Sequence, residues 1–248
     1  MKVIILAAGY ATRLYPRTKN FPKPLLEVNR KPIIEYLIEK VELIPAASKV
    51  IVVTNARFAD IFRRWAEKLD THLPIEVLND GTRTPEQRLG AVGDMSLAFR
   101  KESYRGDFLV LGGDNFFQDP LDAFIGSARR RKNAATIGVF DIKCRKEASR
   151  FGVVKLDARH RVVDFTEKPS APRSSLIAMC LYYFPQQSLG RIREYLADGR
   201  NSSDAAGAYI KWLARTSTVY GYRFGHLWVD IGNKQTYDRI NELTSGKE

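Results

Sequence analysis

The chain has 248 residues, of which 44% are hydrophobic and 27% are charged, a composition typical of one globular domain. A chain of this length buries most of its apolar surface without disulfides, so the disordered, collagen-like and disulfide-scaffold classes are excluded. Lysine and arginine together number 40 against 28 acidic residues, and the formal net charge of +12 favours anionic partners such as nucleic acid, acidic lipid or phosphate-rich small molecules.

In the first half of the chain, short runs rich in β-branched residues alternate with longer segments whose apolar residues recur at helical spacing. Strands that alternate with helices in this way predict a parallel sheet that helices cover on both faces. The predicted strands are 2–7, 49–54, 75–78, 108–111 and 135–140, and the predicted helices are 32–43, 59–69, 91–100 and 121–132.

The pattern changes after residue 141, where two strand-like runs flank a four-residue turn and predict a β-hairpin. We therefore expect a single α/β domain over residues 1–248. Residues 1–141 would form a nucleotide-binding half, and residues 142–248 would complete the sheet and wall a second pocket, with ligands beyond the carboxyl ends of the strands. The hairpin strands are 151–156 and 161–166, the later strands are 176–184 and 219–224, and the later helices are 189–196, 204–214 and 234–243.

The cysteines and the longest apolar runs indicate in which cellular compartment the protein is located. Cys144 and Cys180 form no CxxC pair and have no histidine nearby, which excludes a structural zinc site and fits reduced thiols in the cytosol. The apolar run at 3–8 is too short for a signal-peptide core, and no later run approaches the roughly 20 apolar residues of a membrane-spanning helix. We expect a cytoplasmic protein without a membrane partner.

The most informative segment is the loop after the first strand, residues 6–18, with its continuation to residue 25. Small residues at the end of the strand let the backbone approach a ligand closely, and free N–H groups there bind anions. Arg13 adds a planar fork that matches phosphate oxygens, and Lys23, held between Pro22 and Pro24, adds a point charge. Neither a Walker loop nor a GxGxxG motif occurs, which argues against P-loop kinases and dinucleotide enzymes.

The same loop resembles the signature of the sugar-phosphate nucleotidyltransferases, G-x-G-T-R-L-x-P-x-T followed by P-K-P-L. Here it reads GYATRLYPRT at 9–18 and PKPL at 22–25. The resemblance, nearest to glucose-1-phosphate thymidylyl- and uridylyltransferases, extends over essentially the whole chain. It implies a Rossmann-like, mostly parallel central sheet with helices on both faces and a smaller, β-rich sugar-binding part. Two glycines of the family are replaced, by Ala11 in the signature and by Cys180, whose side chain would narrow the sugar pocket.

The resemblance implies a role for each matching motif. As catalytic cations, Arg13 would contact the β- and γ-phosphates of the nucleotide and Lys23 the α-phosphate. Asp114 in the segment LGGDN and Asp230 in the segment WVDIG would hold Mg²⁺, the implied cofactor. Mg²⁺ favours one or two carboxylates together with phosphate oxygens, so these two carboxylates suit it.

The same resemblance implies two binding pockets. On the sugar side, Lys168 would neutralise the phosphate of the sugar 1-phosphate, and Glu167 would accept hydrogen bonds from sugar hydroxyls. Gly152 in the segment FGVV would let the backbone meet the sugar. On the nucleotide side, Asn79 would bond the edge of a pyrimidine and Gly90 would admit its flat face. The implied nucleotide-binding set is Leu6, Ala8, Gly9, Asn79, Gly90 and Gly113.

The implied reaction joins a nucleoside triphosphate and a sugar 1-phosphate into a nucleoside-diphosphate sugar and releases pyrophosphate. A phosphate monoester is a competent nucleophile near neutral pH, which agrees with the absence of His72, His160 and His226 from every motif. Catalysis then depends on positioning and charge neutralisation. Two unit charges about 4 Å apart interact by roughly 4 kcal/mol at an effective dielectric constant near 20, so the cations offset a large repulsion.

Two alternatives stay open. One is a cytidylyltransferase that acts on a non-sugar phosphorylated acceptor, against which the segments 151–154 and 204–212 favour a sugar. The other is a non-catalytic protein that binds nucleotides or nucleic acid, but the dense basic run at 129–132 ends a predicted helix, where cations complement the helix dipole.

The expected partners are a nucleoside triphosphate and a sugar 1-phosphate, without nucleic acid. Members of the family often self-associate, so a homo-oligomer is a candidate assembly. Many thymidylyl-type members carry glutamine where Asn79 stands, and the identities of the base and of the sugar are therefore left open.

Overall fold

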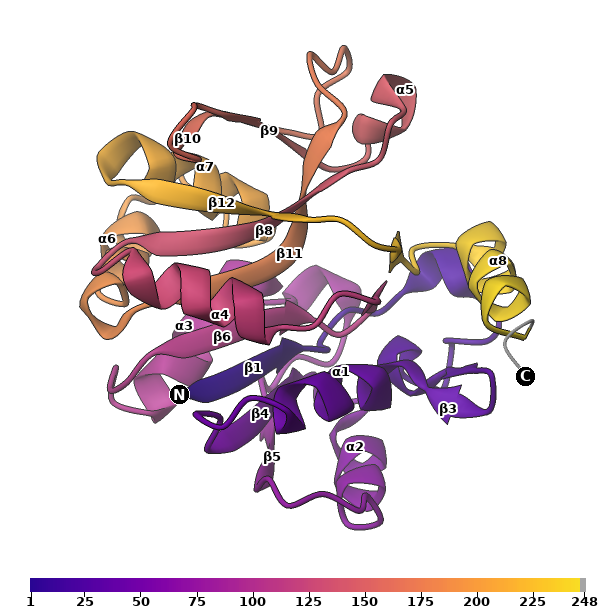
Figure 1. Ribbon diagram of the computed structural model, residues 1–248. Helices are drawn as coiled ribbons and strands as arrows, with labels where there is room; N and C mark the ends of the chain where they lie inside the picture. Colours follow the sequence, from indigo (N-terminus) through magenta and orange to yellow (C-terminus); the bar gives the residue numbers. More distant parts are fainter. Residues whose placement is uncertain (246–248) are drawn as a thin grey trace.

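The computed structural model describes residues 1–245, which build one large sheet with helices on both faces (Figure 1). Its strands are β1 (Lys2–Leu6), β4 (Lys49–Thr54), β5 (Ile75–Asn79), β6 (Phe108–Gly112), β8 (Ala135–Asp141), β9 (Gly152–Leu156), β10 (Val162–Glu167), β11 (Leu176–Phe184) and β12 (Val219–Phe224). Seven of these nine strands lie in the order β10-β9-β11-β6-β1-β4-β5. The other two branch from this row, because β8 pairs with β11, and β12 pairs with β8.

The centre of the sheet is β1, which pairs in parallel with β4 on one side and β6 on the other, while β5 extends the row beyond β4. Val3, Ile4 and Ile5 of β1 are fully buried. Apolar side chains on both faces of a strand are what a parallel sheet covered by two helical layers requires. The parallel α/β arrangement predicted for the first half of the chain is therefore confirmed.

The neighbour of β6 on its other side comes from the second half of the chain. β11 pairs antiparallel with β6 through Leu181–Phe184, and antiparallel with β8 on its other edge. The strand predicted at 135–140 is present as β8, but it does not pair with any strand of the first half. β11 takes the place beside β6 because it presents apolar side chains to both helical layers, Leu181 to one and Tyr182 to the other. The two expected halves thus share one sheet.

A bulge in β11 opens the sheet. Residues 179–181 of β11 face Gly138 alone on β8, because the pairing moves from Ala178 with Val139 to Tyr182 with Ile137. Before the bulge β11 pairs with β9, and after it β11 pairs with β6. Bulges often re-aim side chains next to active sites. Here the change of partner leaves a gap between β6 and β9 at the carboxyl end of β6.

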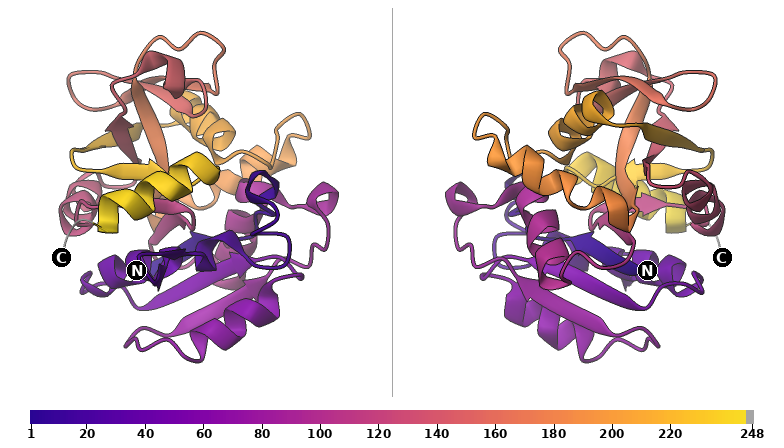
Figure 2. Two further views of the ribbon diagram at one scale, coloured as in Figure 1. Left: turned by 90° about the vertical axis from the view of Figure 1, so that its right-hand side faces the viewer. Right: turned by 90° about the vertical axis from the view of Figure 1, so that its left-hand side faces the viewer.

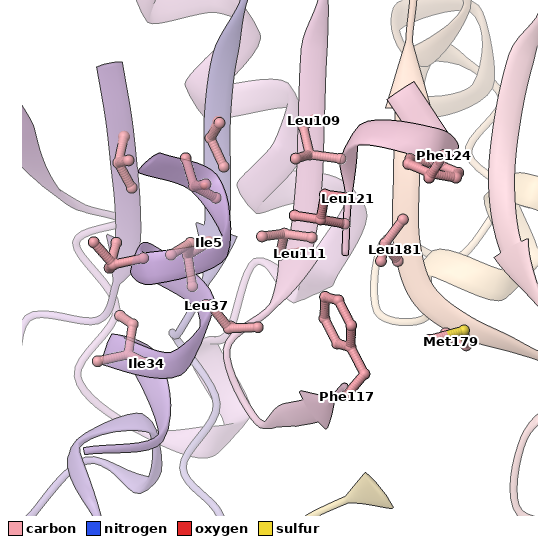
Figure 3. Packing of buried hydrophobic residues seen from close by; sticks show 14 of the residues in the cluster. Ile5, Ile34, Leu37, Leu109, Leu111, Phe117, Leu121, Phe124, Met179 and Leu181 are labelled. Carbon is pink, nitrogen blue, oxygen red and sulfur yellow. The ribbon is translucent and has the colours of Figure 1, made fainter. Parts of the chain in front are cut away.

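Two layers of helices cover the sheet, and each encloses its own apolar core (Figures 1 and 2). One layer is formed by α1 (Ile33–Glu42), α2 (Ala59–Ala66) and α4 (Asp122–Arg130), and the other by α3 (Gly90–Lys101), α6 (Arg191–Ala197) and α7 (Ala206–Thr216). Figure 3 shows part of the first core, which contains Ile5 and Leu111 of the sheet, Leu37 of α1 and Phe124 of α4. Full burial of each such side chain stabilises the fold by about 1.5–3 kcal/mol.

Two short sheets and the last helix flank this body. β7 (Asn115–Phe117) pairs with β13 (Trp228–Asp230), and β2 (Glu27–Val28) pairs with β3 (Lys31–Pro32). The helix α8 (Lys234–Ser245) lies beside the β2–β3 pair (Figure 1), and a third apolar cluster that includes Ile33, Phe116 and Ile240 joins these pieces. The remaining elements are α5 (Arg145–Ala148) and four short 3-10 turns, η1 (Thr12–Leu14), η2 (Lys23–Leu25), η3 (Pro85–Gln87) and η4 (Gln186–Ser188).

Each predicted helix and strand has a counterpart whose ends lie within three residues of the expected ones. The elements that the sequence did not predict, such as α5, β7 and β13, have four residues or fewer, too short for a period to be recognised. Within residues 1–245, no helix has both the length and the apolar character that are needed to cross a membrane.

One buried carboxyl group in α3 works against stability. Asp94 is only 5% exposed, and its Oδ1 has no hydrogen-bond partner among the described residues. The Oδ2 of Asp80 is likewise buried and unpartnered. Burial, together with the negative charge of Asp80, raises the pKa of Asp94 to about 8. The folded protein therefore holds a proton on Asp94 that the unfolded chain releases above about pH 4.

We expect Asp94→Ala to stabilise the protein. Because the folded state binds this proton between about pH 4 and pH 8 and the unfolded state does not, the stability of the native chain falls as pH rises through that window. The substitution should raise the free energy of unfolding at pH 7 by about 2–4 kcal/mol and flatten this decline, as measured by urea denaturation at several pH values. Asp164→Ala, at an exposed position of β10, serves as the control. A less stable Asp94→Ala protein would contradict the assignment.

Candidate active site

A cleft of about 280 Å³ lies where β11 changes partner between β6 and β9. Its walls come from segments that are far apart in the sequence: the loop after β1, the end of β6, the β9–β10 hairpin, the start of α7, and β13. Six of the site residues predicted from the sequence line it, namely Arg13, Asp114, Gly152, Glu167, Lys168 and Asp230. A further predicted site residue, Lys23, joins these six through its contact with Asp114.

The pairing of β7 with β13 brings the two aspartates together. Asn115 is the register partner of Asp230, and the backbone N–H of Ile231 donates to the carbonyl of Asp114 at 3.1 Å. The indole N–H of Trp228 donates to Asn115 at 2.7 Å, and the Asn115 amide in turn donates to the Asp114 carboxylate at 3.1 Å. The short β7–β13 sheet and this side-chain network thus hold the two carboxyl groups in one place.

The electrostatics of this pair favour a bound cation. Burial and the negative charge of Asp114 raise the pKa of Asp230 to about 6, while the positive charges of Lys23, Arg150 and Lys168 act in the opposite direction. Two neighbouring carboxylates repel each other, and a cation between them removes that repulsion. Oxygen donors of this kind are the ligands of a hard divalent ion.

Lys23 already neutralises one of these carboxylates. Its Nζ lies 2.6 Å from Oδ2 of Asp114, and its side chain is only 11% exposed. The lysine begins the turn η2, between Pro22 and Pro24, and Leu25 anchors that turn in the core. The ammonium group is thus fixed in position by the chain around it, as the sequence predicts.

Arg13 supplies a second cation at the rim of the cleft. It lies in η1, where its neighbour Leu14 is buried and holds the turn against the protein. The Arg13 side chain is exposed and forms no ion pair within residues 1–245. A guanidinium group without a carboxylate partner can bind phosphate oxygens of a ligand.

The two residues that replace glycines of the family, Ala11 and Cys180, both have left-handed backbone conformations. Ala11 has φ 47° and ψ 42°, and Cys180, inside the β11 bulge, has φ 53°. A residue with a Cβ costs on the order of 1 kcal/mol in this region, so the chain tolerates strain beside the cleft. Thr18 donates a hydrogen bond to the Ala11 carbonyl at 2.8 Å and closes the loop. Burial and the charge of Asp114 raise the pKa of Cys180 to about 12, so the thiol stays protonated at neutral pH.

Glu167 lines the cleft on the β9–β10 hairpin, and Gly207 makes room for it. A Cβ at Gly207 would lie 1.9 Å from Oε2 of Glu167, whereas a Cβ at Gly152 would first meet the ring of Phe165 at 2.4 Å. Burial raises the pKa of Glu167, while Lys168, whose Nζ is 3.7 Å away, opposes that shift. Glycine at position 207 therefore lets the carboxylate lie against the first turn of α7, and glycine at position 152 accommodates the ring of Phe165.

Two residues of this site were not assigned a role by the sequence analysis. Gly207 lies in a segment that resembles sugar members of the family, but only the structure reveals that it adjoins Glu167. Arg150 precedes the FGVV segment, is exposed, and lines the cleft near Asp230. Its position beside the FGVV motif was the available signal, since an arginine there adds positive charge next to a segment that the resemblance places at the ligand.

The residues predicted to bind the nucleotide do not gather in the cleft as the other predicted site residues do. Within the described chain none of them lines the cleft, although Gly113 adjoins Asp114 and donates a backbone hydrogen bond to Leu6 at 2.9 Å. Ala8 accepts a hydrogen bond from Asn55, and Gly9 is exposed with open space around it. These contacts shape the loop next to the cleft, and the binding role itself stays a prediction.

Asn79 and Gly90, the two residues predicted to bind the base, make contacts with other parts of the chain. Asn79 is exposed, and its side-chain oxygen accepts a hydrogen bond from the backbone of Gly81. Gly90 is buried with φ +78°, and a Cβ there would lie 2.4 Å from Cα of Asp204. Contact with another part of the chain therefore accounts for the glycine at 90, and the base-binding role of Asn79 and Gly90 stays a prediction.

The whole chain matches one known family. The sequence profile of the nucleotidyl transferase family matches residues 2–246. This chain belongs to the nucleotidyl transferase family. A solved structure of a UDP-glucose pyrophosphorylase complexed with UDP-glucose aligns with this nucleotidyl transferase at a TM-score of 0.84 and 18% identity, covering 100% of this chain and 99% of that one. This likeness confirms the Rossmann-like fold predicted from the sequence.

Curated relatives of this nucleotidyl transferase extend beyond it in length. A bifunctional GlmU protein of Methanocaldococcus jannaschii is 30% identical over 256 residues, which cover 100% of this chain and 57% of that protein. The catalytic subunit beta of a mannose-1-phosphate guanylyltransferase from Xenopus tropicalis is 26% identical over 239 residues, covering 96% and 62% respectively. The chain thus spans a little over half the length of these relatives.

A pair of helical glycines tests the packing around Glu167. Replacing Gly126 in α4 by alanine meets only the tip of Arg130 at 3.6 Å, so Gly126→Ala should stabilise this nucleotidyl transferase by about 0.5–1 kcal/mol. Gly207→Ala in α7 should give no such gain, because the new methyl group displaces the Glu167 carboxylate. Urea denaturation of both variants measures the difference. Equal stabilisation by the two substitutions would contradict the close packing of Glu167 on α7.

Proposed function

We propose that this nucleotidyl transferase transfers a nucleotidyl group from a nucleoside triphosphate to a sugar 1-phosphate and releases pyrophosphate. The observation that carries the proposal is the composition of one cleft. Arg13 and the aspartate pair line it together with Glu167 and Lys168, and Lys23 joins them through its contact with Asp114. Arg13, Lys23 and the aspartate pair suit a triphosphate, and Glu167 with Lys168 suits a phosphorylated, hydroxyl-rich acceptor.

In the proposed reaction an oxygen of the sugar phosphate forms a bond to the α-phosphorus, and the bond from that phosphorus to the bridging oxygen of pyrophosphate breaks. The acceptor is already an anion, so the site needs no base to activate it. None of the three histidines is among the residues that line the cleft, within the described chain. The work of the protein is therefore to align two anions and reduce their repulsion.

In the proposed reaction each cation of the cleft interacts with a different phosphate group. Lys23, fixed on Asp114, supports the α-phosphate, and Arg13 at the rim supports the departing phosphates. Lys168 neutralises the acceptor phosphate beside Glu167, which accepts hydrogen bonds from the acceptor's hydroxyl groups. Each unit-charge repulsion that these groups offset is on the order of 4 kcal/mol at about 4 Å.

Mg²⁺ is the proposed cofactor, and the donor set fits it. Asp114 and Asp230 would hold the ion, because they are neighbouring oxygen ligands and the charge of Asp114 raises the pKa of Asp230. When bound there, the ion supplies further neutralisation of the triphosphate. Lys23 then remains as the fixed cation next to the same carboxylate.

The decisive experiment is a matrix of nucleoside triphosphates against acceptors. The acceptors are hexose, hexosamine and heptose 1-phosphates together with phosphorylated alcohols, and released pyrophosphate is measured with and without Mg²⁺. Turnover with at least one sugar 1-phosphate is expected. Turnover with phosphorylated alcohols alone would favour the cytidylyltransferase alternative, and no turnover with any pair would contradict an enzymatic role. Cytoplasmic location and a homo-oligomeric assembly stay predictions.

Lys168→Ala should raise KM for the sugar 1-phosphate and lower kcat. Loss of a charge-assisted contact to phosphate, worth about 1.5–3 kcal/mol, corresponds to roughly a 10- to 100-fold fall in kcat/KM. Steady-state kinetics with the acceptor varied measures both constants. Lys155→Ala, an exposed lysine on the same hairpin, is the matched control and should behave like the native enzyme. Unchanged kinetics in Lys168→Ala would remove this lysine from the acceptor site.

Asp230→Asn should abolish Mg²⁺-dependent turnover, with a loss of at least about 10²-fold, while the fold persists. The amide has the same shape and carries no charge, so removing a carboxylate whose pKa burial has raised should not lower the melting temperature. Pyrophosphate release against Mg²⁺ concentration and thermal unfolding separate the two effects. Retained Mg²⁺-dependent activity would discard the metal role.

A further inference from the structure

Two segments from different halves of the chain meet beside the cleft. One is the connection between β5 and α3, which contains Arg88 and leads into Gly90, the first residue of α3. The other is the connection between α6 and α7, residues 198–205, which contains Ser203 and Asp204. We call the contact between Arg88 and residues 90–92 on one side and Ser203 and Asp204 on the other the clasp.

The clasp is made of directional contacts. Nε and Nη2 of Arg88 donate to the two carboxylate oxygens of Asp204 at 2.8 and 3.0 Å, the bidentate geometry that orients an arginine pair most strictly. The backbone N–H of Ala91 donates to the carbonyl of Asp204, and that of Val92 to the carbonyl of Ser203, each at 2.9 Å.

These backbone bonds give the clasp a second function in the fold. The first N–H groups of a helix have no partner within the helix, and α3 has no side-chain cap. The carbonyls of Ser203 and Asp204 satisfy two of these groups. Gly90 allows the approach, because a Cβ at this position would collide with the backbone of Asp204.

The clasp connects the two walls of the proposed active site. Ala91, which follows Gly90, lines the cleft on the side of the first half of the chain. Ala205 and Gly207, which follow Asp204, line the cleft from the second half of the chain, and Gly207 is the residue against which Glu167 packs. A shift of residues 203–204 relative to α3 would therefore move Glu167, part of the proposed acceptor site, relative to the wall that the first half contributes.

We propose that Arg88 and Asp204 are positioning residues that fix the acceptor site relative to the nucleotide site. This inference rests on the proposed function. Both side chains are about half exposed, at 54% and 55%, and an exposed ion pair contributes little to folding stability. A misplacement of about 1 Å between two reacting groups, in contrast, costs about 10²-fold in rate. The role of the pair should thus be visible in kcat and not in the melting temperature.

The test compares Arg88→Met and Asp204→Asn with the native enzyme, using the substrate pair that gives turnover in the matrix above. Each substitution should lower kcat about 5- to 20-fold. The dissociation constant of the triphosphate alone should change less than about twofold, because the wall that the first half contributes keeps its own residues. The exchanged pair, Arg88→Asp with Asp204→Arg, should recover most of the lost kcat, since it restores a bidentate contact between the same backbones.

Arg200→Met is the matched control. It removes a bidentate pair with Asp198 that lies inside the same 198–205 connection but does not cross to α3. Its kcat should equal that of the native enzyme. Native-like kcat in Arg88→Met, a kcat loss that the exchanged pair fails to recover, or an equal loss in Arg200→Met would each overturn the inference.

A readout independent of turnover checks the contact itself. Amide hydrogen exchange at Ala91 and Val92 should become faster in Arg88→Met and return toward the native rate in the exchanged pair, because these N–H groups donate across the clasp. Unchanged exchange would overturn the inference even if the native enzyme is active. An inactive native enzyme would contradict the proposed function first, and the positioning role would fall with it.

Discussion

The candidate active site depends on the pairing register of two three-residue strands, β7 and β13. β7 follows β6 directly, β13 lies more than a hundred residues later, and their antiparallel pairing sets Asn115 opposite Asp230. This pairing fixes the positions of both aspartates. The backbone carbonyl of Asp114 accepts a hydrogen bond from Ile231 and its carboxylate accepts one from the Asn115 amide, while Asp230 is itself a residue of β13. A one-residue slip would turn Asp230 to the other face of the ribbon, away from Asp114. The hydrogen bond from Trp228 to Asn115 joins the two strands through their side chains and so supports this register.

The chemistry of the cleft follows from unequal burial of opposite charges. The carboxylates of Asp230 and Glu167 are withdrawn from water, so burial raises the pKa of both. The cations around them differ in kind, since Lys23 is held and nearly covered whereas Arg13 and Arg150 are exposed. A nearly covered, fixed inner cation and exposed outer ones suit the proposed reaction, in which negative charge develops on the departing pyrophosphate. The bulge in β11 makes this arrangement accessible by separating β9 from β6.

Much of this was readable from the sequence, and the failures have physical causes. Hydrophobic period located the helices and strands, and the proline pair around Lys23 indicated a rigidly held cation. The insertion of β11 beside β6 was not foreseen, because a strand that is apolar on both faces looks the same whether its neighbours run parallel or antiparallel. The convergence of Asp114 and Asp230 was expected only through the family resemblance, since three-residue strands leave no periodic signal.

Glycine was the least specific signal. Gly90 was expected to admit a base, but its Cβ direction is filled by the backbone of Asp204. Gly207 received no role, because the carboxylate that requires it belongs to a strand 40 residues earlier. A glycine in the sequence indicates that another group comes close to the backbone, but it does not identify that group. Only the tertiary structure tells whether the group belongs to a ligand or to another segment of the chain.

The insertion of β11 also has a consequence for how the chain is made. β6 gains its second hydrogen-bonded neighbour from residues 181–184, about 70 positions further along. During synthesis, the leading β1–β4–β5–β6 portion therefore emerges from the ribosome with the edge of β6 uncovered, in addition to the outer edge of β5, until β11 has followed it. Open edges of this kind recruit other strands, so this interval is where nascent chains would be most prone to self-association and most in need of chaperone protection.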